Sequence, residues 1–184
     1  MAVTVTPEQF SYVFFEAAMI RDTATELLER LGMADRDLRV DVDEASPIAR
    51  VRVTSVEPLA VLAESGGFED TRRPRYASEQ AVAGNLGRVL LRVRDREQGG
   101  FAEAPGDEEL SLRQTAAWDT YCVGRLDRLG YPANHQRWLY NFRNRHGFTD
   151  IGDAAFETLW NADSLTWAEL ESISAEAEAA KLPA

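Results

Sequence analysis

The stretch LRVDVDEASPIARVRVTSV, residues 38–56, has the clearest alternation of apolar and polar residues in the chain. Leucine and valine alternate with charged residues over 38–43, and valine alternates with arginine and threonine over 50–54. A period of two is typical of strands with one buried face. Residues 43–47 are turn formers, so we expect an antiparallel hairpin with a valine-rich inner face.

The sequence before this stretch predicts a long helix that Thr6 caps and Gly32 ends. Pro7 suits the first helical turn, and Gln9 completes a capping box with Thr6. Val5 can pack on Phe10 as a hydrophobic staple. The apolar residues inside this range recur at helical spacing and form one broad face. They are Phe10, Val13, Phe14, Ala17, Ile20, Ala24, Leu27, Leu28 and Leu31.

The apolar run over 57–65 fits either a third strand or a short helix, because periodicity does not separate the two at this length. A second long helix is expected from Ser78 to about Gln98, where Gly99 and Gly100 end it. Residues 98–110, QGGFAEAPGDEEL, concentrate glycine, proline and acidic residues, which is typical of a linker.

Residues 111–184 show helical periods and no strand period, and we expect four helices there. Their ranges are about 111–129, 134–146, 150–161 and 167–181. Capping boxes are predicted at Ser111 with Gln114, and at Thr166 with Glu169. The sequence thus predicts an α+β fold with two lobes. An N-terminal lobe, 1–98, holds a helix, an antiparallel hairpin of two to three strands and a second helix. A linker, 99–110, leads to an all-α lobe, 111–184. The two lobes can also form one compact domain.

The chain has 184 residues and a formal net charge of −11, which disfavours general binding to nucleic acid or to anionic membranes. Residues 72–100 are the exception, with seven arginines against three acidic residues. One cysteine, Cys122, allows no internal disulfide and no thiolate metal cluster. We find no run of apolar residues that could span a membrane, and no secretory signal pattern in MAVTVTPEQF. A cytoplasmic protein is expected.

Three arginines of the basic region, Arg88, Arg92 and Arg96, fall on one flank of the predicted helix 78–98. Guanidinium groups one turn apart can follow the phosphates of a nucleic acid or the carboxylates of an acidic helix. They can equally form an exposed face paired with acidic residues of the chain.

The segment HQRWLYNFRNRHGF, residues 135–148, mixes arginines with aromatic residues, as single-stranded nucleic-acid sites do. Arg137, Trp138 and Arg145 are the candidate binding residues there. An amphipathic helix with Trp138 inside and the two arginines outside explains the same pattern.

Catalytic and metal-binding patterns are weak in this sequence. His135 and His146 are too far apart to bind one metal from a continuous helix, and Cys122 lies where a buried helix position is expected. A cluster of His146, Asp150 and Asp153 could bind a cation, but the two aspartates also suit the first turn of a helix. We therefore predict no metal and no cofactor.

These observations favour a non-catalytic protein-interaction or accessory protein. Its acidic surface would steer a basic partner, and aromatic residues of the helical half would anchor that partner. Two alternatives stay open. One is a nucleic-acid-binding protein that uses Arg88, Arg92 and Arg96. The other is a small-molecule enzyme whose Asp, Tyr, Arg and His residues form no recognisable motif.

Overall fold

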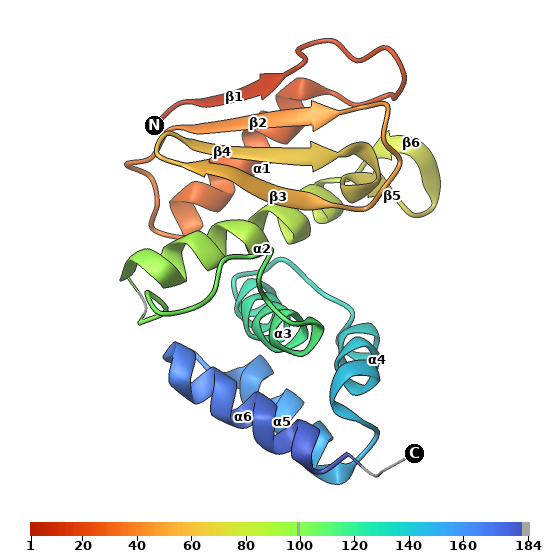
Figure 1. Cartoon of the computed structure of the whole chain (residues 1–184). Helices are drawn as coiled ribbons and strands as arrows, with labels where there is room; N and C mark the ends of the chain where they lie inside the picture. Colours follow the sequence, from red (N-terminus) through yellow and green to blue (C-terminus); the bar gives the residue numbers. More distant parts are fainter. Residues whose placement is uncertain (99, 182–184) are drawn as a thin grey trace. The chain divides into compact units, whose positions relative to one another are not determined.

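The computed structural model describes residues 1–98 and 100–181. The described residues form six α-helices, a four-stranded sheet and a two-stranded sheet, which is a mixed α+β content (Figure 1). The chain divides into two compact units, Met1–Leu91 and Arg92–Ala184, called unit 1 and unit 2 below. The division into lobes at a linker, 99–110, stays a prediction, and Gly99 lies outside the described residues.

The four-stranded sheet of unit 1 has the strand order β1-β2-β4-β3. The strands are β1 (Val3–Thr6), β2 (Leu38–Asp43), β3 (Val51–Val56) and β4 (Leu59–Glu64). β2 runs parallel to both β1 and β4, and β3 is antiparallel to β4 at the edge. Residues 57–65, for which the sequence left a strand and a short helix open, therefore contain a strand.

The predicted antiparallel pairing of 38–43 with 50–54 is wrong, because β2 and β3 are not neighbours in the sheet. Both segments are strands, as their alternation indicates. The hairpin instead joins β3 to β4 through Glu57 and Pro58. β4 is buried along nearly its whole length, and a buried strand takes a central place in a sheet.

The predicted start of the first helix at Thr6 is also wrong, since α1 begins at Ala17 and ends at Arg30. Thr6 ends β1, whose alternating valines and threonines suit a strand and pair with β2. Residues 7–16 form a loop. The predicted end is confirmed, because Gly32 follows the helix with φ 68°, a left-handed conformation that glycine adopts without strain.

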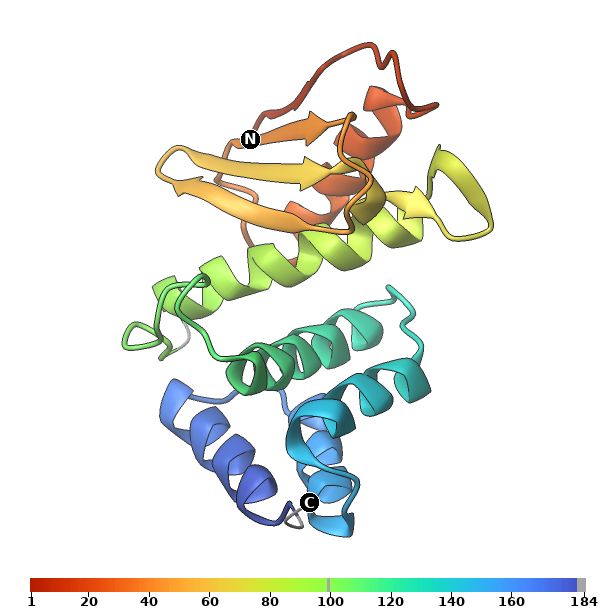
Figure 2. The ribbon, with the colours of Figure 1, turned by 45° about the vertical axis from the view of Figure 1, so that its right-hand side comes forward.

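One face of this sheet is covered by α1 and by the first part of α2 (Glu79–Gln98), as Figures 1 and 2 show. The alternate residues Leu38, Val40 and Val42 of β2 are buried on that face. The chain between β4 and α2 contains a short helix η1 (Ser65–Gly67) and a hairpin of β5 (Glu69–Asp70) and β6 (Arg73–Ala77). The predicted helix from Ser78 to Gln98 is confirmed as α2.

The four predicted helices of the C-terminal part are confirmed in the described residues. They are α3 (Leu112–Arg128), α4 (His135–His146), α5 (Asp150–Asn161) and α6 (Trp167–Ala179). Both predicted capping boxes are present, at the starts of α3 and α6. α3 packs against the other three helices, and its Trp118 is fully buried.

The segment between α2 and α3 contributes to this core. Phe101 is fully buried, and its ring lies 4.9 Å from that of Trp118 and 6.0 Å from that of Tyr121, centroid to centroid. Among residues 1–98 and 100–181, no helix is both long enough and apolar enough to cross a bilayer.

Candidate interaction surfaces

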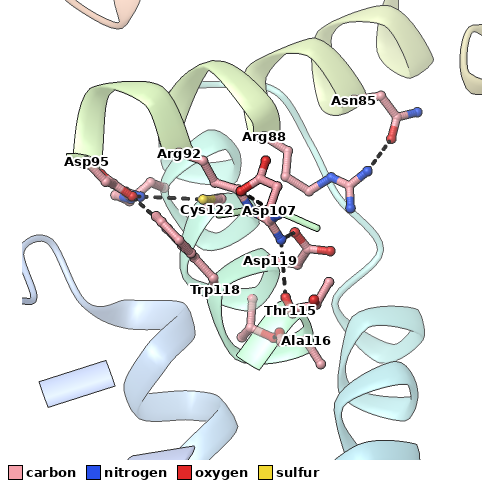
Figure 3. A network of polar contacts seen from close by, with 12 residues as sticks. Asn85, Arg88, Arg92, Asp95, Asp107, Thr115, Ala116, Trp118, Asp119 and Cys122 are labelled. Carbon is pink, nitrogen blue, oxygen red and sulfur yellow. Dashed lines mark hydrogen bonds and ion pairs between the residues drawn. The ribbon is translucent and has the colours of Figure 1, made fainter. Parts of the chain in front are cut away.

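The candidate residue Arg92 is buried in unit 2, with 6% of its surface exposed. Its Nη2 lies 2.5 Å from Oδ1 of Asp119, and its Nη1 lies 3.5 Å from Oδ1 of Asp107 (Figure 3). Arg96, one turn further along α2, donates to the same Asp107 oxygen at 2.7 Å. These two guanidinium groups therefore link the end of α2 to α3 and to the segment that precedes it.

A third carboxylate, Asp95, lies on α2 directly before Arg96. It is 4% exposed and accepts both Nη groups of Arg125 at 2.7 Å and the indole N–H of Trp118 at 2.9 Å. The guanidinium of Arg96 lies 4.6 Å from the centre of the Trp118 ring. A buried acid with three donors fits a structural role, because each charge has its partner.

The surroundings keep these groups in unreactive protonation states. Burial alone would lower the pKa of Arg92, but the nearby groups, with the Asp119 carboxylate the strongest, raise it above its usual value. Burial raises the pKa of the Cys122 thiol to about 12. A thiol that stays protonated at neutral pH is a poor nucleophile. The buried Cys122 accepts a hydrogen bond from Nη2 of Arg125 at 3.6 Å.

The third candidate of this helix, Arg88, belongs to unit 1. Its Nη2 donates to Oδ1 of Asn85 at 3.3 Å, and Asn85 in turn donates to the carbonyl of Gly67 at 2.6 Å. The three arginines that share a flank in the sequence thus have different surroundings. Their assignment as a binding site stays a prediction; Arg92 is the most buried of the candidates, at 6% exposure.

The two histidines have separate partners. His146 is fully buried; Nδ1 lies 3.2 Å from the carbonyl oxygen of Phe142, and Nε2 lies 2.8 Å from Oγ of Ser174. Burial lowers the pKa of His146 to about 4, so the ring is neutral at pH 7. His135 pairs with Glu157 at 3.0 Å. Within the described parts of the chain, no group of three or more metal-ligating side chains is close enough to hold a metal ion.

The helix α4 carries the other three candidates, and its outer side is apolar in part. Arg137 and Arg145 are exposed, and Trp138 is half-buried. Tyr140 and Phe148 are 60% and 61% exposed, and their rings are 5.9 Å apart in an edge-to-face contact. We call Tyr140, Phe148 and the 57% exposed Ile151 the α4 surface.

Arg143 contacts residues beside this surface. It makes two hydrogen bonds to Asp153, from Nε at 2.7 Å and from Nη2 at 2.5 Å, and its guanidinium lies 5.8 Å from the centre of the Phe148 ring. The paired Asp153 carboxylate has a lowered pKa because it accepts these bonds. The bidentate pair ties α4 to α5 and fixes the segment that carries Phe148.

Arg145 faces a cavity of about 380 Å³ beside the start of α3. The cavity is lined by three basic side chains, Arg113, Arg145 and Lys181, and by one acidic side chain, Glu178. Arg113 is already paired, with Glu171 and Glu178, both at 2.8 Å. The cavity is open to solvent, and it combines charged and apolar groups without a catalytic arrangement.

Unit 1 carries a second exposed set of aromatic residues, which the sequence analysis missed. Phe14 and Tyr76 are 56% and 37% exposed, and their rings stack with centres 5.0 Å apart. The guanidinium of Arg75 lies 5.0 Å from the Phe14 ring centre, and that of Arg73 lies 4.1 Å from the Tyr76 ring centre. We call these four residues the arginine–aromatic patch.

The patch escaped prediction because residues 7–16 were assigned to a buried helix face, where Phe14 would point inward. The segment TRRPRYA, residues 71–77, carried the usable signal. It places three arginines beside a tyrosine and a turn-forming proline, which is a composition typical of contact surfaces.

Comparisons of this chain with protein-family models, with curated proteins and with solved structures gave no match. The function is therefore argued from the surfaces and charges alone.

Proposed function

We propose that this chain is a non-catalytic, cytoplasmic protein-interaction or accessory protein, and that a partner protein binds the α4 surface. The observation that carries this proposal is the exposure of Tyr140, Phe148 and Ile151, each more than half accessible on a short stretch of unit 2. Adjacent exposed aromatic residues are typical of the anchors that dominate protein interfaces.

The backbone under this surface is held in place, so a partner can dock on it without rearrangement. Tyr140 lies inside α4, and Phe148 lies one residue before the N-cap of α5, Thr149. The Arg143–Asp153 pair fixes the two helices at this junction. A rigid aromatic anchor loses little conformational entropy on binding, so more of its contact energy appears as affinity.

The charge of the chain indicates the kind of partner. A net charge of −11 attracts basic proteins over long range and repels nucleic acid. The nucleic-acid alternative also loses Arg92, which is buried and paired with Asp119. The proposed partner is therefore a protein of net positive charge with an apolar contact for the α4 surface.

A capture experiment with matched variants tests this proposal. The wild-type chain, the double variant Y140S/F148S and a control, I48S, are immobilised, and proteins bound from cell extract are quantified. Ile48 is 52% exposed in unit 1, so the control also removes exposed apolar surface. We expect a saturable partner retained by wild type and I48S and reduced about tenfold or more by Y140S/F148S.

All three proteins should unfold at nearly the same temperature, since the substituted side chains are exposed. Equal retention by the double variant, or the lack of any saturable partner, would contradict the proposal.

A further inference from the structure

We propose that the arginine–aromatic patch of unit 1 binds an acidic peptide segment of a partner protein, at a site separate from the α4 surface. Arg73 and Arg75 present two guanidinium groups beside the stacked rings of Phe14 and Tyr76. Arg72, next to them on the chain, is exposed as well. A guanidinium fork binds a carboxylate through two parallel hydrogen bonds, so Arg72 and Arg73 have the donors for two acidic side chains.

Two carboxylates of the loop and the hairpin are engaged by backbone groups. Glu44 accepts hydrogen bonds from the backbone N–H of Ser11 at 2.6 Å and of Tyr12 at 2.5 Å. Asp70 accepts from the backbone N–H of Arg72 at 2.8 Å. These bonds fix the loop and the hairpin, and they leave the guanidinium groups to other partners.

Arg72, Arg73 and Arg75 have no ion pair with any carboxylate in the parts of the chain that the structure describes. These three guanidinium groups lie within four consecutive positions of a chain with 31 acidic and 20 basic residues. Other exposed arginines of unit 1 do have acidic partners. Arg39 pairs with Asp41 at 2.9 Å, and Arg50 pairs with Glu64 at 3.4 Å.

The patch is held in place before any partner binds. Arg75 has φ 68°, a left-handed conformation that non-glycine residues adopt only where their surroundings hold them. Its carbonyl accepts the backbone N–H of Phe14 at 2.7 Å, and its guanidinium donates to the carbonyl of Tyr12, from Nε at 2.7 Å. These contacts join the loop 7–16 to the β5–β6 hairpin, so the donors need little ordering on binding.

The same geometry favours a peptide over a nucleic acid. Each aromatic ring already stacks on the other ring and has a guanidinium near its centre, so a base would compete with these contacts. The net charge of −11 also opposes a long polyanion more than a short acidic segment. Nε and Nη2 of Arg75 donate to the carbonyl of Tyr12, so the guanidinium groups of Arg72 and Arg73 are the ones available to bind carboxylates through two hydrogen bonds each.

Selection from a random library of displayed twelve-residue peptides tests the inference. The full-length wild type is the bait, and the double variant R72Q/R73Q serves for counter-selection, because it leaves the Arg75 contacts with Tyr12 intact. We expect the peptides that depend on these arginines to carry a clear excess of Asp and Glu. The best of them should bind the variant at least about tenfold more weakly in fluorescence anisotropy.

Two comparisons make this result specific. The variant R39Q/R50Q also removes two positive charges, from arginines of unit 1 that have acidic partners. Its affinity for the selected peptide should stay within about twofold of wild type. A twelve-nucleotide oligouridine RNA should bind more weakly than the peptide. Selected peptides without acidic excess, equal loss in R39Q/R50Q, or tighter binding of the RNA would each overturn the proposal. Failure of the α4 variants in the capture experiment leaves this result unaffected, since the two sites share no residue.

Discussion

Asp95 is a buried carboxylate of unit 2 that holds the side chain of Arg125. It sits at 4% exposure and accepts three hydrogen bonds, two from Arg125 and one from Trp118. The sequence placed arginines of this helix on a flank and offered exposed pairing as one explanation. It could not show that Arg92 is buried, because burial of a charge depends on carboxylates such as Asp107 and Asp119, which lie more than ten positions away along the chain.

Replacing Asp95 by asparagine should destabilise unit 2 by about 2 to 4 kcal/mol, because it leaves Arg125, whose side chain is only 13% exposed, without a countercharge. Urea unfolding followed by tryptophan fluorescence measures this loss. The control D163N alters a side chain that is 92% exposed and only 3.3 Å from Arg128, and it should cost less than about 1 kcal/mol. Equal stability of D95N and wild type would show that Asp95 does not hold the network together.

His146 should make stability depend on pH. Its pKa in the fold is about 4 and lies below the usual value of 6.5, chiefly through burial, with Arg113 and Lys181 lowering it and Glu178 raising it. The unfolded chain therefore binds a proton more readily. The stabilisation is complete above about pH 6.5 and declines as the pH falls toward 4.

From pH 7 to pH 5 this histidine should reduce the free energy of unfolding by about 2 kcal/mol. The variant H146Q keeps a partner for Ser174 and lacks the titration, so the stability difference between wild type and H146Q should shrink by that amount. A difference that stays constant over this range would contradict the lowered pKa.

At the scale of helices and strands, local signals predicted the helices of unit 2 and failed at the start of unit 1. The capping boxes at Ser111 and Thr166 act within four residues, and the structure contains both. Thr6 and Pro7 resemble such a signal, yet β1 forms because it pairs with β2 more than thirty residues away. Strand pairing is likewise a long-range choice, so the alternation over 38–56 predicted strands but not their neighbours.

Gly124 tests the packing of α3 against α5, and Gly84 of α2 is the matched control. A Cβ at Gly124 would overlap the backbone carbonyl of Trp160, so Gly124→Ala should destabilise the protein by about 2 to 3 kcal/mol. A Cβ at Gly84 of α2 meets nothing within 4 Å, and Gly84→Ala should stabilise by about 0.5 to 1 kcal/mol. Thermal unfolding of both variants gives the two signs, and a neutral Gly124→Ala would refute the close approach.

Across the whole molecule, the proposal of protein partners rests on the net charge and on the exposed aromatic residues. The helical half was expected to supply the aromatic anchors, and the exposed Tyr140 and Phe148 lie there. The arginine–aromatic patch was not foreseen, because Phe14 and Tyr76 come together only through the contact between a loop and a distant hairpin. Binding by Arg137, Trp138 and Arg145 remains a prediction.

The chain should not bind nucleic acid at physiological salt. With a net charge of −11 and Arg92 buried, a random 20-base-pair DNA duplex should stay unshifted in a mobility assay up to about 50 µM protein in about 0.15 M salt. A complex whose affinity falls steeply with added salt and is weakened by Arg88→Glu would support the nucleic-acid alternative instead.

Calorimetric titration of the captured partner into the full chain at several temperatures tests the central claim most directly. Burial of the α4 surface predicts a negative heat-capacity change on binding. It also predicts an affinity at least about tenfold lower for Y140S/F148S and unchanged for I48S. The same affinity and heat-capacity change in Y140S/F148S as in wild type would contradict the claim that partners bind through Tyr140 and Phe148 of the α4 surface.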